Sequence, residues 1–369
     1  MKKIVVSMMA VVMIASASLA MTPASIPHGT SAKFAAMGGA GSALVDDVTS
    51  AYYNPAGMAK AQSMALKIGA GAATDGLNDM INTLSSAGDP SKFILDNYAN
   101  ALDLNGSANV MIGLDIFKTG ISFIPAATLN VSKNANSAAG SATATVMGEG
   151  VVTIGRGVSV PYLGNLNAGA NIKYVADTFG SANVAGSTST TLTTAYTGMG
   201  FDLGVQGRVD AIPTMPISIG VVYKDIAETL RGKTSTTTKT IDPATGQVLS
   251  ETKTPDADLP DQTTPTTFVL GAAAKIPVVG ATVAIDLDNV AAAAATQAYS
   301  VTHIGIEYPV AMGMVNLRVG TISGGPSGSP INMTTYGAGI LGNMINIAMI
   351  SDNNNRKNNQ TMFDIGFGF

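Results

Sequence analysis

The sequence predicts an all-β transmembrane protein: an antiparallel up-and-down barrel of about 14 strands, with an N-terminal plug (hatch) and short helices in an outer loop. Three observations lead to this fold class. Only 12% of the 369 residues are charged, about half of the fraction in typical soluble domains. Short segments in which apolar and polar residues alternate recur along the chain. The connections between these segments alternate between short and long.

The first 20 residues have the pattern of a secretory signal peptide. Lys2 and Lys3 are followed by an apolar run at residues 4–15, and Ser18 and Ala20 stand at positions −3 and −1 of the expected cleavage site. The apolar run is about a dozen residues, well short of the roughly 20 that a spanning helix needs. We therefore expect export, and we divide the chain into a signal peptide (1–20), an N-terminal hatch (21–63) and a transmembrane barrel (64–369).

Strict alternation of apolar and polar residues begins after the hatch and predicts strands with one apolar face. In residues 109–116, for example, the apolar positions are Val110, Ile112, Leu114 and Ile116. No later apolar stretch is long enough for a spanning helix, and in lipid a closed barrel is the other way to satisfy every backbone group. The expected strands are 66–70, 110–116, 119–131, 143–154, 166–174, 201–209, 217–223, 268–276, 281–287, 304–308, 315–319, 333–341, 345–349 and 361–369.

Short connections follow long ones as turns and outer loops do in bacterial outer-membrane barrels. The exception is 155–165, which is long where a short turn is expected. The long connections include 73–106, whose apolar spacing predicts two short amphipathic helices, and 179–196. Residues 227–265 are rich in Thr, Lys, Asp and Pro and have little to bury, so we expect a mobile surface loop.

The last expected strand alternates up to Phe369. A terminal strand needs this regularity if it is to pair with the first strand and remove both free edges. The pattern also resembles the carboxyl-terminal signal by which outer-membrane barrels are recognised, so the barrel assembly machinery is an expected partner during biogenesis.

Composition argues against several functions. The chain has no Cys and only two His, His28 and His303, which leaves little material for a metal site or histidine-based catalysis. There is no basic cluster that would neutralise the phosphates of a nucleic acid, and the glycines at 38–41 lack dinucleotide-binding spacing. We therefore expect no enzyme activity, no catalytic residue, no metal, no cofactor and no nucleic-acid partner.

The polar faces of the expected strands carry charges of both signs. This balance predicts paired charges that brace a filled interior rather than an ion-selective lining. The residues are Lys67, Lys173, Arg208, Lys224, Lys275 and Arg318, together with Asp115, Asp202, Asp286, Asp288, Glu307 and Asp364.

Residues 33–59, KFAAMGGAGSALVDDVTSAYYNPAGMA, carry a recognisable set of motifs: glycines at 38–41, the acidic pair Asp46 and Asp47, and Tyr53 to Gly57 with Asn54, Pro55 and Ala56 at its centre. The segment resembles the N-terminal region of the FadL family of long-chain fatty acid transporters and its relatives, which include the PorV-like barrels of secretion systems. The resemblance implies a 14-stranded barrel closed by a hatch that carries the Asn-Pro-Ala element. It also implies that hydrophobic molecules bind inside and leave sideways into the membrane. A purely structural plug is the alternative to a gating role.

The same resemblance implies a kink in the third strand that opens the wall. Pro125 lies within that expected strand, where a proline forces a bulge or a missing hydrogen bond. A bulge without any role in transport is the alternative. An apolar pocket near the hatch and the outer helices is expected to contact the ligand, with core packing as the alternative for each candidate. The candidates are Met37, Met58, Met80, Leu84 and Tyr98.

The expected function is passive uptake of hydrophobic small molecules, such as fatty acids or hydrocarbons, across the bacterial outer membrane. Outer-membrane lipid and the ligand are then the chain's partners. A PorV-like barrel that serves as a binding partner or scaffold for envelope or secreted proteins is the second hypothesis. A general porin is the third, and the plug-like segment weighs against it.

Overall fold

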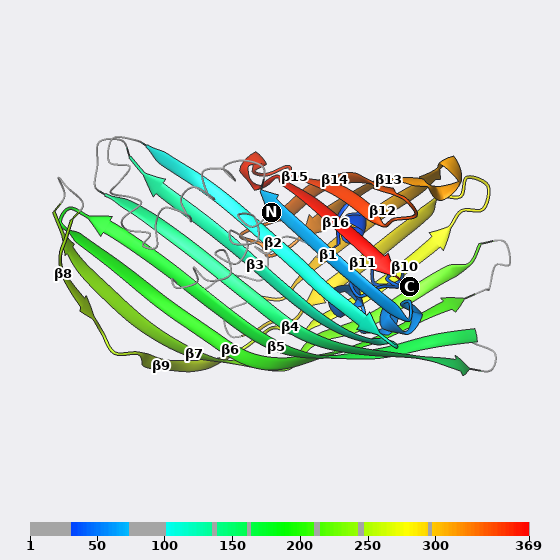
Figure 1. The fold of residues 1–369 in the computed structure, drawn as a ribbon, viewed down its shortest axis with the longest axis horizontal. Coiled ribbons are helices and arrows are strands. Elements are labelled where there is room, and N and C mark those ends of the chain that lie inside the picture. Colours follow the sequence, from blue (N-terminus) through cyan, green and yellow to red (C-terminus); the bar gives the residue numbers. More distant parts are fainter. Residues whose placement is uncertain are drawn as a thin grey trace.

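A computed structural model describes residues 31–73, 101–134, 139–160, 164–209, 215–242, 247–293 and 297–368. Within these residues, fourteen antiparallel strands form a closed ring (Figure 1). The ring runs in sequence order from β1 to β7, passes to β10 because β7 pairs with β10, and continues to β16. β16 then pairs with β1 and closes the ring. No helix in the described part of the chain is long and apolar enough to cross a membrane.

All fourteen expected strands are present, and several are longer than expected. The ring strands are β1 (Met64–Ala73), β2 (Leu102–Ile116), β3 (Thr119–Lys133), β4 (Gly140–Val160), β5 (Gly164–Ala185), β6 (Thr188–Val209), β7 (Ile217–Ile241), β10 (Thr267–Lys275), β11 (Thr282–Val290), β12 (Tyr299–Val310), β13 (Val315–Gly324), β14 (Ile331–Ile340), β15 (Ile345–Asp352) and β16 (Gln360–Gly368). β8 (Val248–Lys253) and β9 (Ala257–Thr263) pair with β7 outside the ring.

The two faces of the strands differ as the alternation predicts. On β13, Leu317 and Val319 are exposed while Arg318 is buried, and on β15 Ile347 is exposed while Ala348 is buried. Each strand therefore turns an apolar face outward, which suits a hydrocarbon solvent, and a mixed polar face inward. The closed 14-stranded barrel predicted from the sequence is confirmed.

Three of the expected connections are wrong. Residues 179–196 are not a loop, because β5 and β6 run to a tight turn at Gly186. Residues 155–165 are mostly strand, because β4 continues to Val160 and β5 begins at Gly164. The mobile loop expected at 227–265 is instead the end of β7, with β8 and β9 paired to it.

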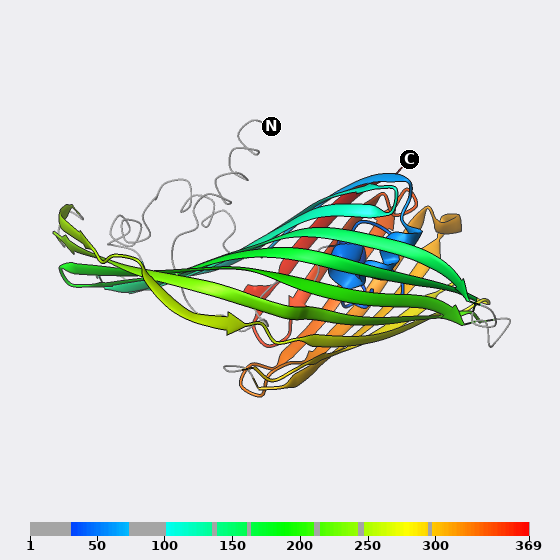
Figure 2. The ribbon, with the colours of Figure 1, turned by 90° about the horizontal axis from the view of Figure 1, so that it is seen from below.

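Threonine explains the errors at 179–196 and 227–265. Residues 188–194 and 234–240 are rich in Thr, which bury little apolar surface but are β-branched and favour extended backbone. Facing threonines also hydrogen-bond across strands, as Thr194 and Thr234 do at 3.3 Å. Figure 2 shows the result: on one side of the ring the long strands extend as a sheet well beyond the others. The expected outer helices at 74–100 lie outside the described residues, and residues 102–106 belong to β2.

The outward face of β13 allows the barrel assignment to be tested. Val319→Arg places a charge on the exposed apolar face nearer the middle of the belt and should destabilise the barrel in lipid by about 2–4 kcal/mol, the cost at the bilayer midplane. Asn332→Arg is the control. Asn332 is exposed near the start of β14, at the end of the barrel away from the β14–β15 turn, and the substitution should cost about 0–1 kcal/mol. Unfolding of each variant in lipid vesicles measures the difference, and equal costs would contradict a lipid-facing wall.

Candidate functional site

Residues 31–63, called the luminal segment below, lie inside the ring of strands (Figure 2). They contain the short helices α2 (Ala32–Ala35), α3 (Ser50–Tyr53) and η2 (Pro55–Lys60). Helices of four to six residues are too short to be stable alone. The contacts that the segment makes with the wall must therefore hold its shape.

Two wall carboxylates bind backbone N–H groups of the luminal segment. The Asp364 Oδ2 atom accepts hydrogen bonds from Ala32 N at 2.6 Å and from the Ser31 hydroxyl at 3.0 Å. The Asp286 Oδ2 atom accepts from Gly41 N at 2.9 Å and from Ser42 N at 2.8 Å. Both aspartates are buried, and hydrogen bonds to charged acceptors are among the stronger ones in proteins. They fix the segment to β16 and to β11.

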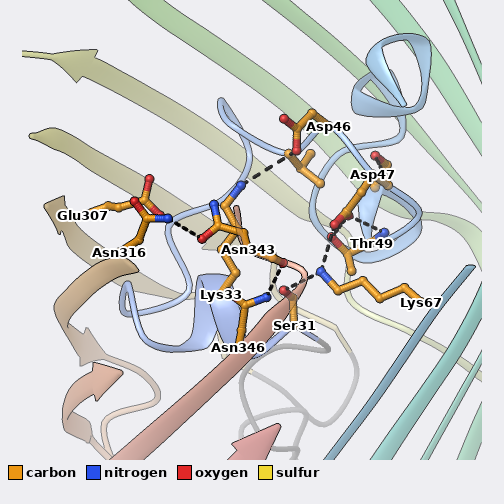
Figure 3. A network of polar contacts seen from close by, with 12 residues as sticks. Ser31, Lys33, Asp46, Asp47, Thr49, Lys67, Glu307, Asn316, Asn343 and Asn346 are labelled. Atoms are coloured by element: carbon orange, nitrogen blue, oxygen red, sulfur yellow. Dashed lines mark hydrogen bonds and ion pairs between the residues drawn. The ribbon is translucent and has the colours of Figure 1, made fainter. Parts of the chain in front are cut away.

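Lys67 on β1 links Asp47 of the luminal segment to Asp364, one of these two wall carboxylates. Its Nζ atom lies 2.8 Å from Asp47 Oδ2 (Figure 3). The same atom lies 3.6 Å from Asp364 Oδ2. Burial raises the pKa of the Asp47 carboxyl, but the Lys67 charge and hydrogen bonds from Lys67 and Thr49 outweigh burial and lower the pKa to about 2. Asp46, in contrast, is exposed and forms a 3.8 Å ion pair with Lys33. Asp47 therefore binds the luminal segment to the wall, whereas Asp46 pairs with a residue of the luminal segment itself.

The Asn54, Pro55 and Ala56 element is buried against the wall. The Asn54 Nδ2 atom donates to Ser42 O at 2.8 Å and to Val205 O of β6 at 3.1 Å, and its Oδ1 atom accepts from Ala56 N at 3.0 Å. Asn54 thus caps η2, with Pro55 at the first helical position, where its missing N–H costs nothing. The element ties two parts of the luminal segment to each other and to β6.

Glycines of the wall allow this close approach. A Cβ atom at Gly169 would lie 2.2 Å from the Pro55 carbonyl oxygen, and one at Gly204 would lie 2.1 Å from Asn54 Oδ1. Similar glycines face the luminal segment from most strands of the ring: Gly113, Gly120, Gly155, Gly220, Gly271, Gly305, Gly320 and Gly337. The sequence analysis did not identify this set. The signal was available, because these glycines occupy the inward positions of alternating strands.

The glycines of the luminal segment itself have a separate cause. Gly38 and Gly39 have positive φ angles of 65° and 86°, which side chains other than glycine rarely adopt. The turn brings the Gly38 carbonyl oxygen to 2.7 Å from His303 Nδ1, which donates to it. The His303 Nε2 atom lies 3.6 Å from Asp288. His303 therefore holds the luminal segment against β12.

Several of the predicted charges of the wall are paired, as the sequence analysis expected, whereas both carboxylate oxygens of Asp115 are buried without a hydrogen-bond partner in the part of the chain that the structure describes. Lys173 lies 3.1 Å from Asp202 and 3.2 Å from Glu228 and also contacts Asp225, while Arg318 binds Glu307 at 2.7 Å. No group of three or more His, Asp or Glu side chains among the described residues could hold a metal ion. These ion pairs connect neighbouring strands of the wall and brace the interior of the barrel.

The structure places the ligand-contact candidates as follows. Met37 and Met58 are fully buried in two apolar clusters between the luminal segment and the wall. The cluster around Met58 also contains Val48, Ala61 and Met111, with Ile124 packed against it. Met80, Leu84 and Tyr98 lie outside the described residues. A ligand-binding or gating role for any of these residues stays a prediction.

The wall is interrupted at Pro125. β2 and β3 pair from Leu102/Lys133 to Asn109/Ala126 and again from Ile112/Phe123 onward, but Val110 and Met111 have no partners in β3. The register on both sides is the same, so the break is a local loss of pairing. Pro125 keeps its pairing with Gly148 of β4, and Met111 keeps its pairing with Gly69 of β1. Met111 and Ile124, at the break, both belong to the Met58 cluster.

Substitution of a wall glycine tests the position of the luminal segment. Gly169→Ala should push the segment from the wall, because overpacking costs about 1–3 kcal/mol. In a Ser50→Cys background, where the new thiol is buried and is the chain's only one, maleimide labelling should become about tenfold faster. Gly150→Ala is the matched control, since nothing lies within 4 Å of its Cβ position. Equal labelling rates in the two variants would contradict the contact.

No family model and no curated protein matches the sequence. Solved structures, in contrast, are similar to it in fold. The chain is similar to the P. putida toluene transporter TodX, with a TM-score of 0.59, 13% identity, and 92% of this chain and 97% of that chain covered. It is similar to the CymD monoaromatic hydrocarbon channel, with a TM-score of 0.56, 12% identity, and coverage of 93% and 99%.

A FadL homologue from Pseudomonas aeruginosa is also similar, with a TM-score of 0.50, 12% identity, and coverage of 89% and 95%. These identities are low, so the likeness is one of fold, over nearly the whole length of both chains. It confirms at that level the resemblance predicted from residues 33–59. The chain has the FadL-like fold that is shared by toluene and monoaromatic hydrocarbon channels.

Proposed function

We propose that the chain is an outer-membrane barrel for passive uptake of hydrophobic small molecules of the fatty acid or hydrocarbon class. The observation that carries the proposal is the break between β2 and β3 at Pro125, with an apolar cluster directly inside it. TodX is a toluene transporter and CymD a monoaromatic hydrocarbon channel. Export by the signal peptide at 1–20 and insertion by the barrel assembly machinery belong to the same proposal.

The break lowers the cost of opening the wall. Elsewhere in a barrel, separating two strands leaves backbone N–H and C=O groups unpaired in lipid, at several kcal/mol each. At Val110, Met111 and Ile124 no pairing across the two strands has to be lost, and Pro125 has no N–H to satisfy. A ligand can therefore widen the wall here at lower cost than at any regularly paired position.

The apolar cluster inside the break gives a hydrophobic molecule a site directly behind the interrupted wall. Met58 and Met111 have flexible, polarisable side chains that adapt to ligands of different shape. In this proposal the luminal segment is a hatch. Its displacement near Met58 opens the way to the break.

The scaffold hypothesis remains the second candidate because of one observation. β8 and β9 pair only with β7, and nearly all of their residues are exposed. Such a surface could bind another envelope protein through its free strand edges. Uptake measurements separate the two candidates, since a scaffold needs no passage through the wall.

The uptake experiment uses the full chain in a host that lacks its own channels for hydrophobic compounds. Labelled toluene and a labelled long-chain fatty acid should each be tested, and at least one should enter several-fold faster than in the empty host. Pro125→Val, which can complete the β2–β3 pairing, should reduce that rate several-fold at equal barrel content.

Pro309→Val is the matched control, because Pro309 lies in β12 with its pairing to Asn316 intact. It should leave uptake unchanged. Uptake that stays at the level of the empty host for both compounds would reject transport. Uptake that is normal in Pro125→Val would reject the break as the exit.

A further inference from the structure

At one end of the barrel, the turns between strands expose large apolar side chains. Because adjacent strands are antiparallel, the β2–β3, β10–β11, β12–β13 and β14–β15 turns all lie at this end. Val278 is 94% exposed and Phe117 is 72% exposed. The set, called the apolar rim below, consists of Phe117, Val278, Val279, Met312, Met314, Leu341 and Met344.

Turn geometry does not explain these residues. Phe117, Met312 and Leu341 have positive φ angles of 50°, 57° and 54°. Bulky residues rarely adopt this conformation, and hairpin turns with positive φ favour Asn and Gly. The sequence thus places large apolar side chains at positions where they strain the backbone and, in water, would be fully hydrated.

The height of the apolar belt supplies an independent argument. On β12 the outward apolar residues run from Ile304 to Val310 and end at Thr302. That run is about 20 Å along the strand, or about 15 Å along the membrane normal at a tilt of about 40°, against an apolar band of about 25 Å in outer-membrane barrels. The outward apolar runs of β13, β14 and β15 end in the same way, at Thr321, Thr334 and Ser351.

We propose that the apolar rim is immersed in the membrane, at the boundary between headgroups and acyl chains, and forms the lower part of the lipid-facing belt. The rim continues the belt along the chain. Met312 lies two residues after Val310, the last outward residue of β12, and Leu341 follows Ile340, the last outward residue of β14. Its residues lie on separate turns spread over more than half of the ring, which suits a bilayer that surrounds the barrel. A single docked protein would need one compact patch.

Immersion of the rim also fixes the depth of the break at Pro125. Pro125 is six residues from the start of β3 at Thr119, which corresponds to about 15 Å above the rim at the same tilt. The break then faces acyl chains rather than headgroups. This part of the inference rests on the proposed function, whereas the position of the rim does not.

Single tryptophans test the position of the rim, because the natural sequence contains no Trp. Met312→Trp and Leu341→Trp variants are refolded into vesicles of phosphatidylcholine with brominated acyl chains. Leu317→Trp, on the outward face of β13, is the reference in the belt. Ser329→Trp, exposed in the β13–β14 connection at the other end, is the control in water.

Bromine should quench the rim tryptophans about as strongly as the Leu317→Trp fluorescence. Quenching no greater than that of Ser329→Trp would overturn the proposal. If the rim tryptophans are unquenched in vesicles but shielded from acrylamide in native outer-membrane fractions, a protein covers the rim and the proposal is again wrong. None of these outcomes depends on uptake.

Bilayer thickness gives a second measurement. The double variant Met312→Asn, Leu341→Asn shortens the belt but suits the positive φ angles, so it should fold normally in detergent. Its yield of insertion should fall several-fold relative to the natural sequence in vesicles of long-chain lipids and stay equal in vesicles of short-chain lipids. Equal yields in both lipids would contradict an immersed rim.

Discussion

Backbone pairing around a closed ring is the constraint on which the rest of the structure depends. A strand in hydrocarbon cannot leave its N–H and C=O groups without partners, and the pairing of β16 with β1 removes the last free edges. Closure forces each strand to turn one face outward and one inward. Closure is also the reason why the break at Pro125 points to a function. A missing backbone pair costs free energy in a lipid-facing wall, so we expect it to persist only where the protein uses it.

The interior is filled by contacts between the luminal segment and the wall. Asp286 and Asp364 bind its backbone, Asn54 caps its longest helix, and the wall glycines provide the room. Because the luminal segment is held by many separate contacts, it can detach from the wall at one of them while the other contacts stay intact. The break lies beside the Met58 cluster, where apolar packing rather than ion pairing holds the segment.

The sequence predicted the ring because alternation with a period of two survives wherever one face meets lipid, as at Ile112 and Leu317. It failed at residues 227–265, because Thr-rich strands above the membrane have polar residues on both faces and so lose that period. It predicted the charges and the Asn54 element. It missed the role of Gly169 and Gly204. The alternation places both glycines on the inward face, but only the positions of Pro55 and Asn54 show why a Cβ atom is absent there.

An experimental structure of the barrel in lipid nanodiscs, soaked with bromobenzene as a toluene analogue, tests the account most directly. The bromine should be located between Met58, Met111 and Ile124, beside a β2–β3 ladder that lacks the pairs at Val110 and Met111. A continuous ladder with no ligand in that cluster would contradict lateral release through this wall.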